Sequence, residues 1–133
     1  MKAKIDTGAQ TTALHADEVT EFEIDGVPWV RFTVHPWQHS ESDAVTVELP
    51  VQDRRTVRSS SGHEETRVVV LIPIELCGRA VQAEVTLTNR EAMVFRMLVG
   101  REALRQGFLV DSDASFLGGR PGRAVRRRNR GKA

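Results

Sequence analysis

Short runs rich in valine, isoleucine, leucine, phenylalanine and threonine recur along this chain, and residues that favour turns separate them. This pattern is typical of β-strands, because branched and aromatic side chains suit a pleated, half-buried surface. The runs predict strands at residues 2–5, 21–24, 29–34, 45–50, 67–76, 81–88 and 108–110. We therefore expect an all-β, or mostly β, domain.

Two turns and one helix complete this prediction. Asp25-Gly26 and Cys77-Gly78 each lie between two predicted strands, and such pairs accept the positive φ angles of a tight hairpin. Residues 101–106 are the one convincing helix, since they favour helix and Gly107 follows as a C-terminal stop.

The length of 133 residues fits a single domain. After Leu117 the composition shifts to glycine, proline and arginine without apolar periodicity, so we assign residues 1–117 to the folded domain and 118–133 to a disordered basic tail. The tail holds seven of the 19 basic residues and no acidic one, which leaves 12 basic against 18 acidic residues in the domain. An acidic domain is thus followed by a basic tail.

Cys77 is the only cysteine, so neither a disulfide nor a cysteine-based zinc cluster can form within one chain, and we expect it to be a small buried hydrophobic residue. The N-terminal residues lack the apolar segment of a signal peptide, and no apolar run approaches the length of a membrane span. These features predict a cytoplasmic protein with no membrane contact.

The chemistry of the chain centres on Asp6-Thr7-Gly8-Ala9, which directly follows a short apolar strand. A carboxylate at a strand-to-turn junction can point into a cleft, Thr7 can bond the backbone groups that fix the loop, and Gly8 permits close approach of another chain. The tetrapeptide alone is also compatible with an ordinary surface turn.

A second signal lies far downstream, where the apolar residues 97–99 end in Gly100-Arg101 and lead into the predicted helix. In this order the two segments resemble those of the retropepsin-like aspartic proteases. In these proteins an Asp-Thr/Ser-Gly loop is followed, late in the chain, by an apolar-apolar-Gly-Arg segment and a helix. Residues 70–81 are similar to the strand, glycine turn and strand that lie between flap and helix in those proteins.

More closely, the chain resembles the bacterial RimB-like family, long labelled ATP-dependent zinc proteases and regrouped with the retropepsins. The resemblance covers residues 2–117 and is carried by residues 5–9, 13–16, 58–65, 95–98 and 107–111. It implies a retropepsin-like acid protease barrel with one short C-terminal helix. Family members usually carry further residues ahead of the catalytic strand, where only five precede Asp6 here, so we expect the first strand and part of the subunit interface to be incomplete.

The resemblance implies that Asp6, Thr7 and Gly8 form the catalytic loop and that Gly100 and Arg101 give it structural support. Aspartic protease chemistry needs two carboxylates that share one proton and activate a water molecule. The chain has one such motif and about half the length of a two-lobed enzyme, so we expect a C2 homodimer in which a second copy supplies the partner carboxylate.

Retropepsins close a β-hairpin flap over a peptide substrate, and the resemblance implies a flap at residues 51–66. Its tip would lie near Ser59-Ser60-Ser61-Gly62, and these residues, with Ala9, would contact the substrate. The alternative is a serine-rich surface turn.

Four arginines surround the predicted flap: Arg54, Arg55, Arg58 and Arg67. Guanidinium groups suit carboxylates, so we expect some of them, Arg58 and Arg67 in particular, to bind an acidic peptide such as a glutamate-rich tail of a ribosomal protein. The equal alternative is that they pair with Asp53, Glu64 and Glu65 on a solvated face.

The sequence predicts no cofactor and no metal. It has neither the GxxxxGK[ST] loop that cradles ATP phosphates nor the HExxH helix that holds zinc. Its four histidines are expected at the surface or in hydrogen bonds: His15, His35, His39 and His63.

A second function remains open at this point. Clustered arginines bind phosphate backbones without sequence specificity, so the tail could attach a catalytically weak retropepsin fold to RNA or to a ribosome. Salt-dependent RNA binding that needs residues 118–133 would favour this binding module, whereas peptide cleavage that needs Asp6 would favour the enzyme.

Overall fold

The computed structural model describes residues 1–58 and 61–130. Their strands are β1 (Ala3–Ile5), β2 (Thr12–His15), β3 (Asp17–Ile24), β4 (Val27–Val34), β5 (Val45–Pro50), β6 (Asp53–Arg58), β7 (Glu64–Leu76), β8 (Arg79–Thr88) and β9 (Met97–Val99). Their helices are α1 (Arg101–Leu104) and α2 (Arg123–Arg128). The domain is therefore mostly β and has a short helix late in the chain, as the sequence predicts.

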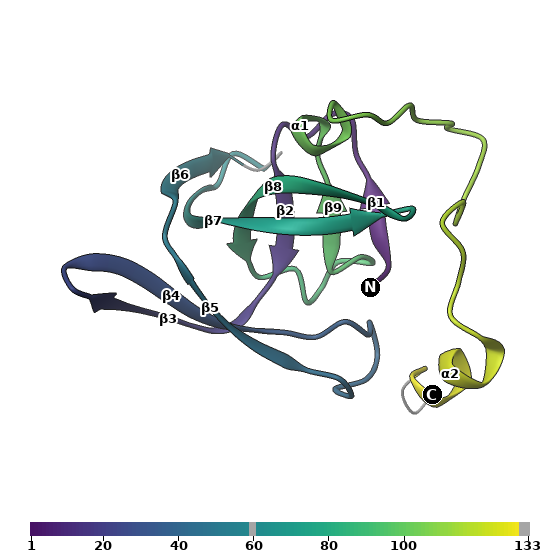
Figure 1. Cartoon of the computed structure of the whole chain (residues 1–133), viewed down its shortest axis with the longest axis horizontal. Coiled ribbons are helices and arrows are strands. Elements are labelled where there is room, and N and C mark those ends of the chain that lie inside the picture. Colours follow the sequence, from purple (N-terminus) through teal and green to yellow (C-terminus); the bar gives the residue numbers. More distant parts are fainter. Residues whose placement is uncertain (59–60, 131–133) are drawn as a thin grey trace.

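The strands form two sheets. The larger has the order β1-β9-β2-β8-β7-β6 and the smaller the order β3-β4-β5. β1 runs parallel to β9, β2 parallel to β8, and β2 antiparallel to β9, so the beginning and the end of the domain interleave in one sheet. In Figure 1 the β3–β4 hairpin extends away from the larger sheet, and the chain after α1 runs around one edge to α2. This interleaving brings the Asp6 loop to the Gly100-Arg101 segment.

The core lies where β4 of the smaller sheet packs on β7 and β8 of the larger one. Phe32 and Val30 are fully buried against alternate residues of β8 such as Val81 and Val85, and Leu104 of α1 closes one end. Alternation follows from the strand geometry, which sends successive side chains to opposite faces. Each large aliphatic side chain buried in this way stabilises the fold by about 1.5–3 kcal/mol.

Both predicted hairpin turns are confirmed. Asp25 and Gly26 have φ angles of 51° and 78°, and Cys77 and Gly78 have φ angles of 52° and 79°. Two successive positive φ angles match the twist of the flanking antiparallel strands. Gly107, with a φ angle of 128°, follows the last turn of helix as expected, although α1 itself ends at Leu104.

Three expectations differ from the structure. Residues 108–110 form no strand in the described chain, and Leu109 is 101% exposed. Cys77 is exposed rather than buried, because it occupies a turn at the tip of a hairpin. The tail contains α2, since Ala124 and the arginines around it have high helix propensity and Gly122 provides the N-cap position. No helix in the described ranges is long and apolar enough to cross a membrane.

Candidate active site

The Asp6 loop begins where β1 ends. The Asp6 N–H donates to the Val99 carbonyl over 3.0 Å, which continues the pairing with β9 by one residue. The Gly8 N–H donates to Asp6 Oδ1 over 3.0 Å, and the Ala9 N–H donates to the Asp6 carbonyl over 3.2 Å. Asp6 is half-buried, whereas Thr7 and Gly8 are exposed. The loop thus fixes one oxygen of a carboxylate that stays accessible from outside the chain.

The Gly100-Arg101 segment contacts this loop directly. The Arg101 N–H donates to the Ala9 carbonyl over 2.8 Å, and Arg101 Nη1 donates to the Gly8 carbonyl over 3.2 Å. A Cβ atom placed on Gly100 would lie 2.7 Å from the carbonyl carbon of Thr11 and 3.0 Å from the Ala9 oxygen. Only a residue without a side chain allows α1 to begin so close to the loop.

A chain of hydrogen bonds joins Gly100, which lies beside the Asp6 loop, to Arg67 of strand β7. Thr12 Oγ1 accepts the Gly100 N–H over 3.2 Å in a buried position, and the Thr12 carbonyl accepts from Thr86 Oγ1 over 3.3 Å. Arg67 Nη1 then donates to Thr86 Oγ1 over 3.4 Å. Arg67 also pairs through Nε with Glu65, over 3.0 Å. The hydrogen bonds through Thr86 and Thr12 therefore connect Arg67 to the segment that holds the Asp6 loop.

Arg90 is a partly buried arginine that the sequence does not single out. Its backbone N–H donates to His15 Nδ1 over 2.9 Å and its Nε donates to the Phe95 carbonyl over 3.1 Å. It forms no ion pair with any residue in ranges 1–58 and 61–130. Burial lowers the pKa of Arg90 and the charge of Arg67 lowers it further, whereas the Asp6 carboxylate raises it. The charges of Arg67 and Asp6 thus both act on the Arg90 guanidinium.

A buried histidine holds Arg90 in place. His15 is 1% exposed, its Nδ1 accepts the Arg90 N–H, and its Nε2 lies 3.1 Å from Asp17 Oδ1. The other Asp17 oxygen lies 3.0 Å from His35 Nε2. The prediction of a hydrogen-bonded histidine is confirmed at His15. No cluster of three metal-binding side chains was found in the described part of the chain.

The predicted flap is the β6–β7 hairpin. Arg58 pairs with Glu64 over 2.6 Å and Arg55 pairs with Asp53 over 3.0 Å, while Arg54 and Arg55 also contact Glu21 and Glu84, respectively. The backbone N–H of Arg54 and then the Arg55 guanidinium lower the pKa of Asp53. Without a bound peptide, these arginines thus pair with acidic residues of the same chain, which is the alternative that the sequence left open.

The comparisons with known proteins agree with this geometry. A profile of the family described as the retropepsin-like aspartic endopeptidase RimB matches residues 1–121. The chain belongs to this family. The Asp6 loop and the Gly100-Arg101 segment both lie within the residues that the RimB-like profile matches.

Relatives of this RimB-like chain carry a different name. It is 44% identical over 122 residues to a probable alpha-L-glutamate ligase of Shewanella pealeana and 42% identical over 111 residues to one of Desulfotalea psychrophila. These matches cover 92% and 84% of the chain but only 27% and 24% of the relatives, so the chain spans about a quarter of their length. A crystal structure of a protein of unknown function from Legionella pneumophila superposes with a TM-score of 0.71 at 32% identity, covering 87% of this chain and 83% of that one.

The structure brings most of the predicted site residues of this RimB-like chain together. Asp6, Thr7, Gly8 and Ala9 form one loop against Gly100 and Arg101, and Arg67 is joined to it through the threonines. Arg58 is 70% exposed on the hairpin, near exposed Ser61 and Gly62. Ser59 and Ser60 lie outside the described residues.

Proposed function

We propose that this chain is one subunit of an aspartic endopeptidase in which the Asp6 carboxylates of two identical chains meet across a twofold axis. The observation that carries the proposal is the Asp6 loop itself: one carboxylate, partly exposed, with one oxygen held by the Gly8 N–H and the loop backbone held by Arg101. A C2 dimer places identical loops face to face, which supplies the second carboxylate.

In such a pair the two carboxylates share one proton, because two like charges at hydrogen-bond distance cannot both ionise freely. The ionised carboxylate takes a proton from a water molecule as the water oxygen attacks the peptide carbonyl carbon. The protonated carboxyl group donates its proton to the carbonyl oxygen. The resulting tetrahedral intermediate breaks its C–N bond as the amine receives a proton. The two acids titrate as a unit rather than as separate groups.

The substrate we propose is a glutamate-rich peptide, such as a glutamate tail added to a ribosomal protein in the cytoplasm. Arg90 is half-buried without an acidic partner in the described chain, and the charges of Asp6 and Arg67 both act on its pKa. A guanidinium in that state is stabilised by a carboxylate from outside. In addition, relatives in which this domain is about a quarter of the chain are named as glutamate ligases, so a hydrolase for glutamate chains fits beside them.

Cleavage of a glutamate-rich peptide and of its glutamine counterpart tests the proposal. We expect the wild type to cleave the glutamate peptide, Asp6→Asn to cleave neither, and Arg90→Gln to lower the preference for glutamate by about tenfold or more, the worth of one charge-assisted hydrogen bond. Arg31→Gln, which removes an exposed arginine paired with Glu48, is the matched control and keeps the preference.

Two outcomes would contradict this proposal. If Asp6→Asn cleaves the peptide as fast as the wild type, the aspartic mechanism is wrong. If Arg90→Gln keeps the wild-type preference for glutamate over glutamine, Arg90 does not bind the acidic side chains. If the wild-type dimer cleaves no peptide at all, the alternative of a retropepsin-fold binding module takes its place.

A further inference from the structure

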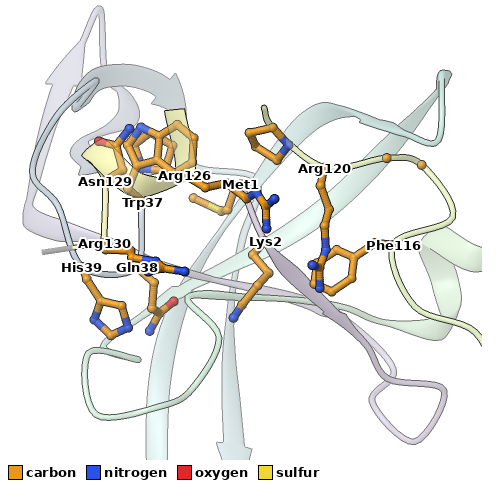
Figure 2. Close-up of a pocket in the computed structure, with 14 residues that line it drawn as sticks. Met1, Lys2, Trp37, Gln38, His39, Phe116, Arg120, Arg126, Asn129 and Arg130 are labelled. Atoms are coloured by element: carbon orange, nitrogen blue, oxygen red, sulfur yellow. The ribbon is translucent and has the colours of Figure 1, made fainter. Parts of the chain in front are cut away.

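A cavity separate from the Asp6 loop lies between the start of the chain, the segment after β4 and the tail. Its volume is about 580 Å³, and it is lined by residues 1–2, 36–39 and parts of 116–130. Figure 2 shows Trp37, Asn129 and Arg126 at one side of this cavity and Arg120 with Phe116 at the other, with Lys2 between them. None of these residues takes part in the site described above.

Among residues 1–58 and 61–130, the side chains that line the cavity with a full charge are all basic: Lys2, Arg120, Arg126 and Arg130. The acidic residue Asp43 does not line the cavity but accepts a hydrogen bond from Trp37 Nε1 over 2.7 Å. None of the four forms an ion pair within the described ranges, although six acidic residues pair with arginines elsewhere. The Arg120 guanidinium instead lies 3.9 Å from the centroid of the Phe116 ring. Such unpaired cations favour an anionic ligand.

Two further groups narrow the class of anion. The Trp37 ring is part of the wall, and indole and phenyl rings stack well on the flat face of a nucleobase. Asn129 is 5% exposed, and its Nδ2 donates to the Val125 carbonyl over 3.0 Å while its Oδ1 accepts no hydrogen bond in the described chain. A buried amide oxygen left without a donor costs free energy, so a ligand N–H that reaches it is favoured.

We propose that this cavity binds a nucleotide of a single-stranded nucleic acid, with the base against Trp37 and Asn129 and the phosphates against Arg126, Arg130, Arg120 and Lys2. Each part of a nucleotide then has a matching group: a π-face for the base, an acceptor for its N–H, and cations for its phosphates. An acidic peptide would satisfy the cations but would leave the aromatic wall unused. The cavity volume is within the range of small-molecule sites.

Fluorescence anisotropy of labelled ten-nucleotide RNA and DNA, titrated with the full chain at several salt concentrations, tests this site. We expect Arg126→Glu to weaken binding about tenfold or more and to reduce the salt slope by about 0.7 for each phosphate that the variant no longer neutralises. Arg127→Glu changes the net charge equally on the neighbouring residue of α2, which does not line the cavity, and should weaken binding much less. The ratio of RNA to DNA affinity identifies which nucleic acid the site prefers.

The stacking contact has its own test. The chain has two tryptophans, so Trp29→Phe leaves Trp37 as the only indole, and we expect nucleic acid to quench its fluorescence. Trp37→Leu should weaken binding about 5- to 150-fold, the range for removing one base–aromatic stack, whereas Trp37→Phe should recover most of the affinity.

Three results would overturn the proposal: equal weakening by Arg126→Glu and Arg127→Glu, no change of Trp37 fluorescence on binding, or displacement of the nucleic acid by polyglutamate of the same charge. Asp6→Asn should bind nucleic acid as tightly as the wild type does, so this test is independent of peptide cleavage.

Discussion

Gly100→Ala is the most specific prediction about the framework of the site. The φ and ψ angles of Gly100 are −84° and 171°, which any residue adopts, so the substitution introduces no backbone strain and acts through space alone. The new Cβ would lie 2.7 Å from the Thr11 carbonyl carbon. Carbon atoms pack best about 3.5–4.0 Å apart, so the Thr11 backbone or the start of α1 has to withdraw by roughly 0.8 Å.

Overpacking of this kind costs about 1–3 kcal/mol, which corresponds to a fall in Tm of roughly 3–12 °C for a domain of this size. Because the Ala9 carbonyl that accepts the Arg101 N–H also lies 3.0 Å from the new atom, we expect peptide cleavage to fall by more than the fraction of unfolded protein accounts for. Thermal unfolding by circular dichroism and a cleavage assay measure the two effects.

Gly122→Ala is the matched control. A Cβ atom on Gly122 meets nothing within 4 Å, and its φ angle of −56° is also unstrained, so Tm and cleavage should stay as in the wild type. If Gly100→Ala shifts Tm no more than this control does, the close contact between the helix start and the Asp6 loop is not a feature of the molecule.

Three further predictions concern single interactions. Thr12→Val should destabilise the fold by about 1–3 kcal/mol in urea unfolding, because it leaves the buried N–H of Gly100 without an acceptor, whereas Thr12→Ser should not. Cys77 should react with a thiol reagent in the native protein as fast as in urea, since it is exposed; slow native labelling would contradict its position at the turn. The lowered pKa of Asp53 means that its contribution to stability is present above its ordinary pKa of 3.8 and is lost as the pH falls through the lowered value. Asp53→Asn should therefore reduce Tm at about pH 7 and make less difference near pH 2; a constant difference would contradict this.

The strands and turns that were predicted correctly are those whose local chemistry decides their structure. The apolar run of β7, the alternating residues of β8 and the two hairpin turns need no distant contact to be recognised. β2 was missed because all four of its residues, Thr12–His15, are buried, so no polar and apolar alternation marks it. β6 was missed because its sequence, DRRTVR, is mostly charged and becomes a strand by pairing with β7.

The candidate site divides in the same way. The Asp6 loop and Gly100-Arg101 are recognisable because each is a short run of consecutive residues that directly follows an apolar strand. Arg90 is one arginine among many in the sequence, and only the fold joins it to His15, which is 75 residues away along the chain, and exposes it to the charge of Asp6. The cavity at Trp37 likewise depends on the tail folding back toward the first residues, which composition alone does not show.

The most direct test of the account is to mix wild-type chains with Asp6→Asn chains under conditions where subunits exchange. If each site needs Asp6 from both copies, an equal mixture has only about one quarter of its dimers intact, and cleavage of the glutamate peptide per wild-type chain falls to about one half. A rate per wild-type chain that is unchanged by the mutant chains would show that one Asp6 suffices, and the shared site would be wrong.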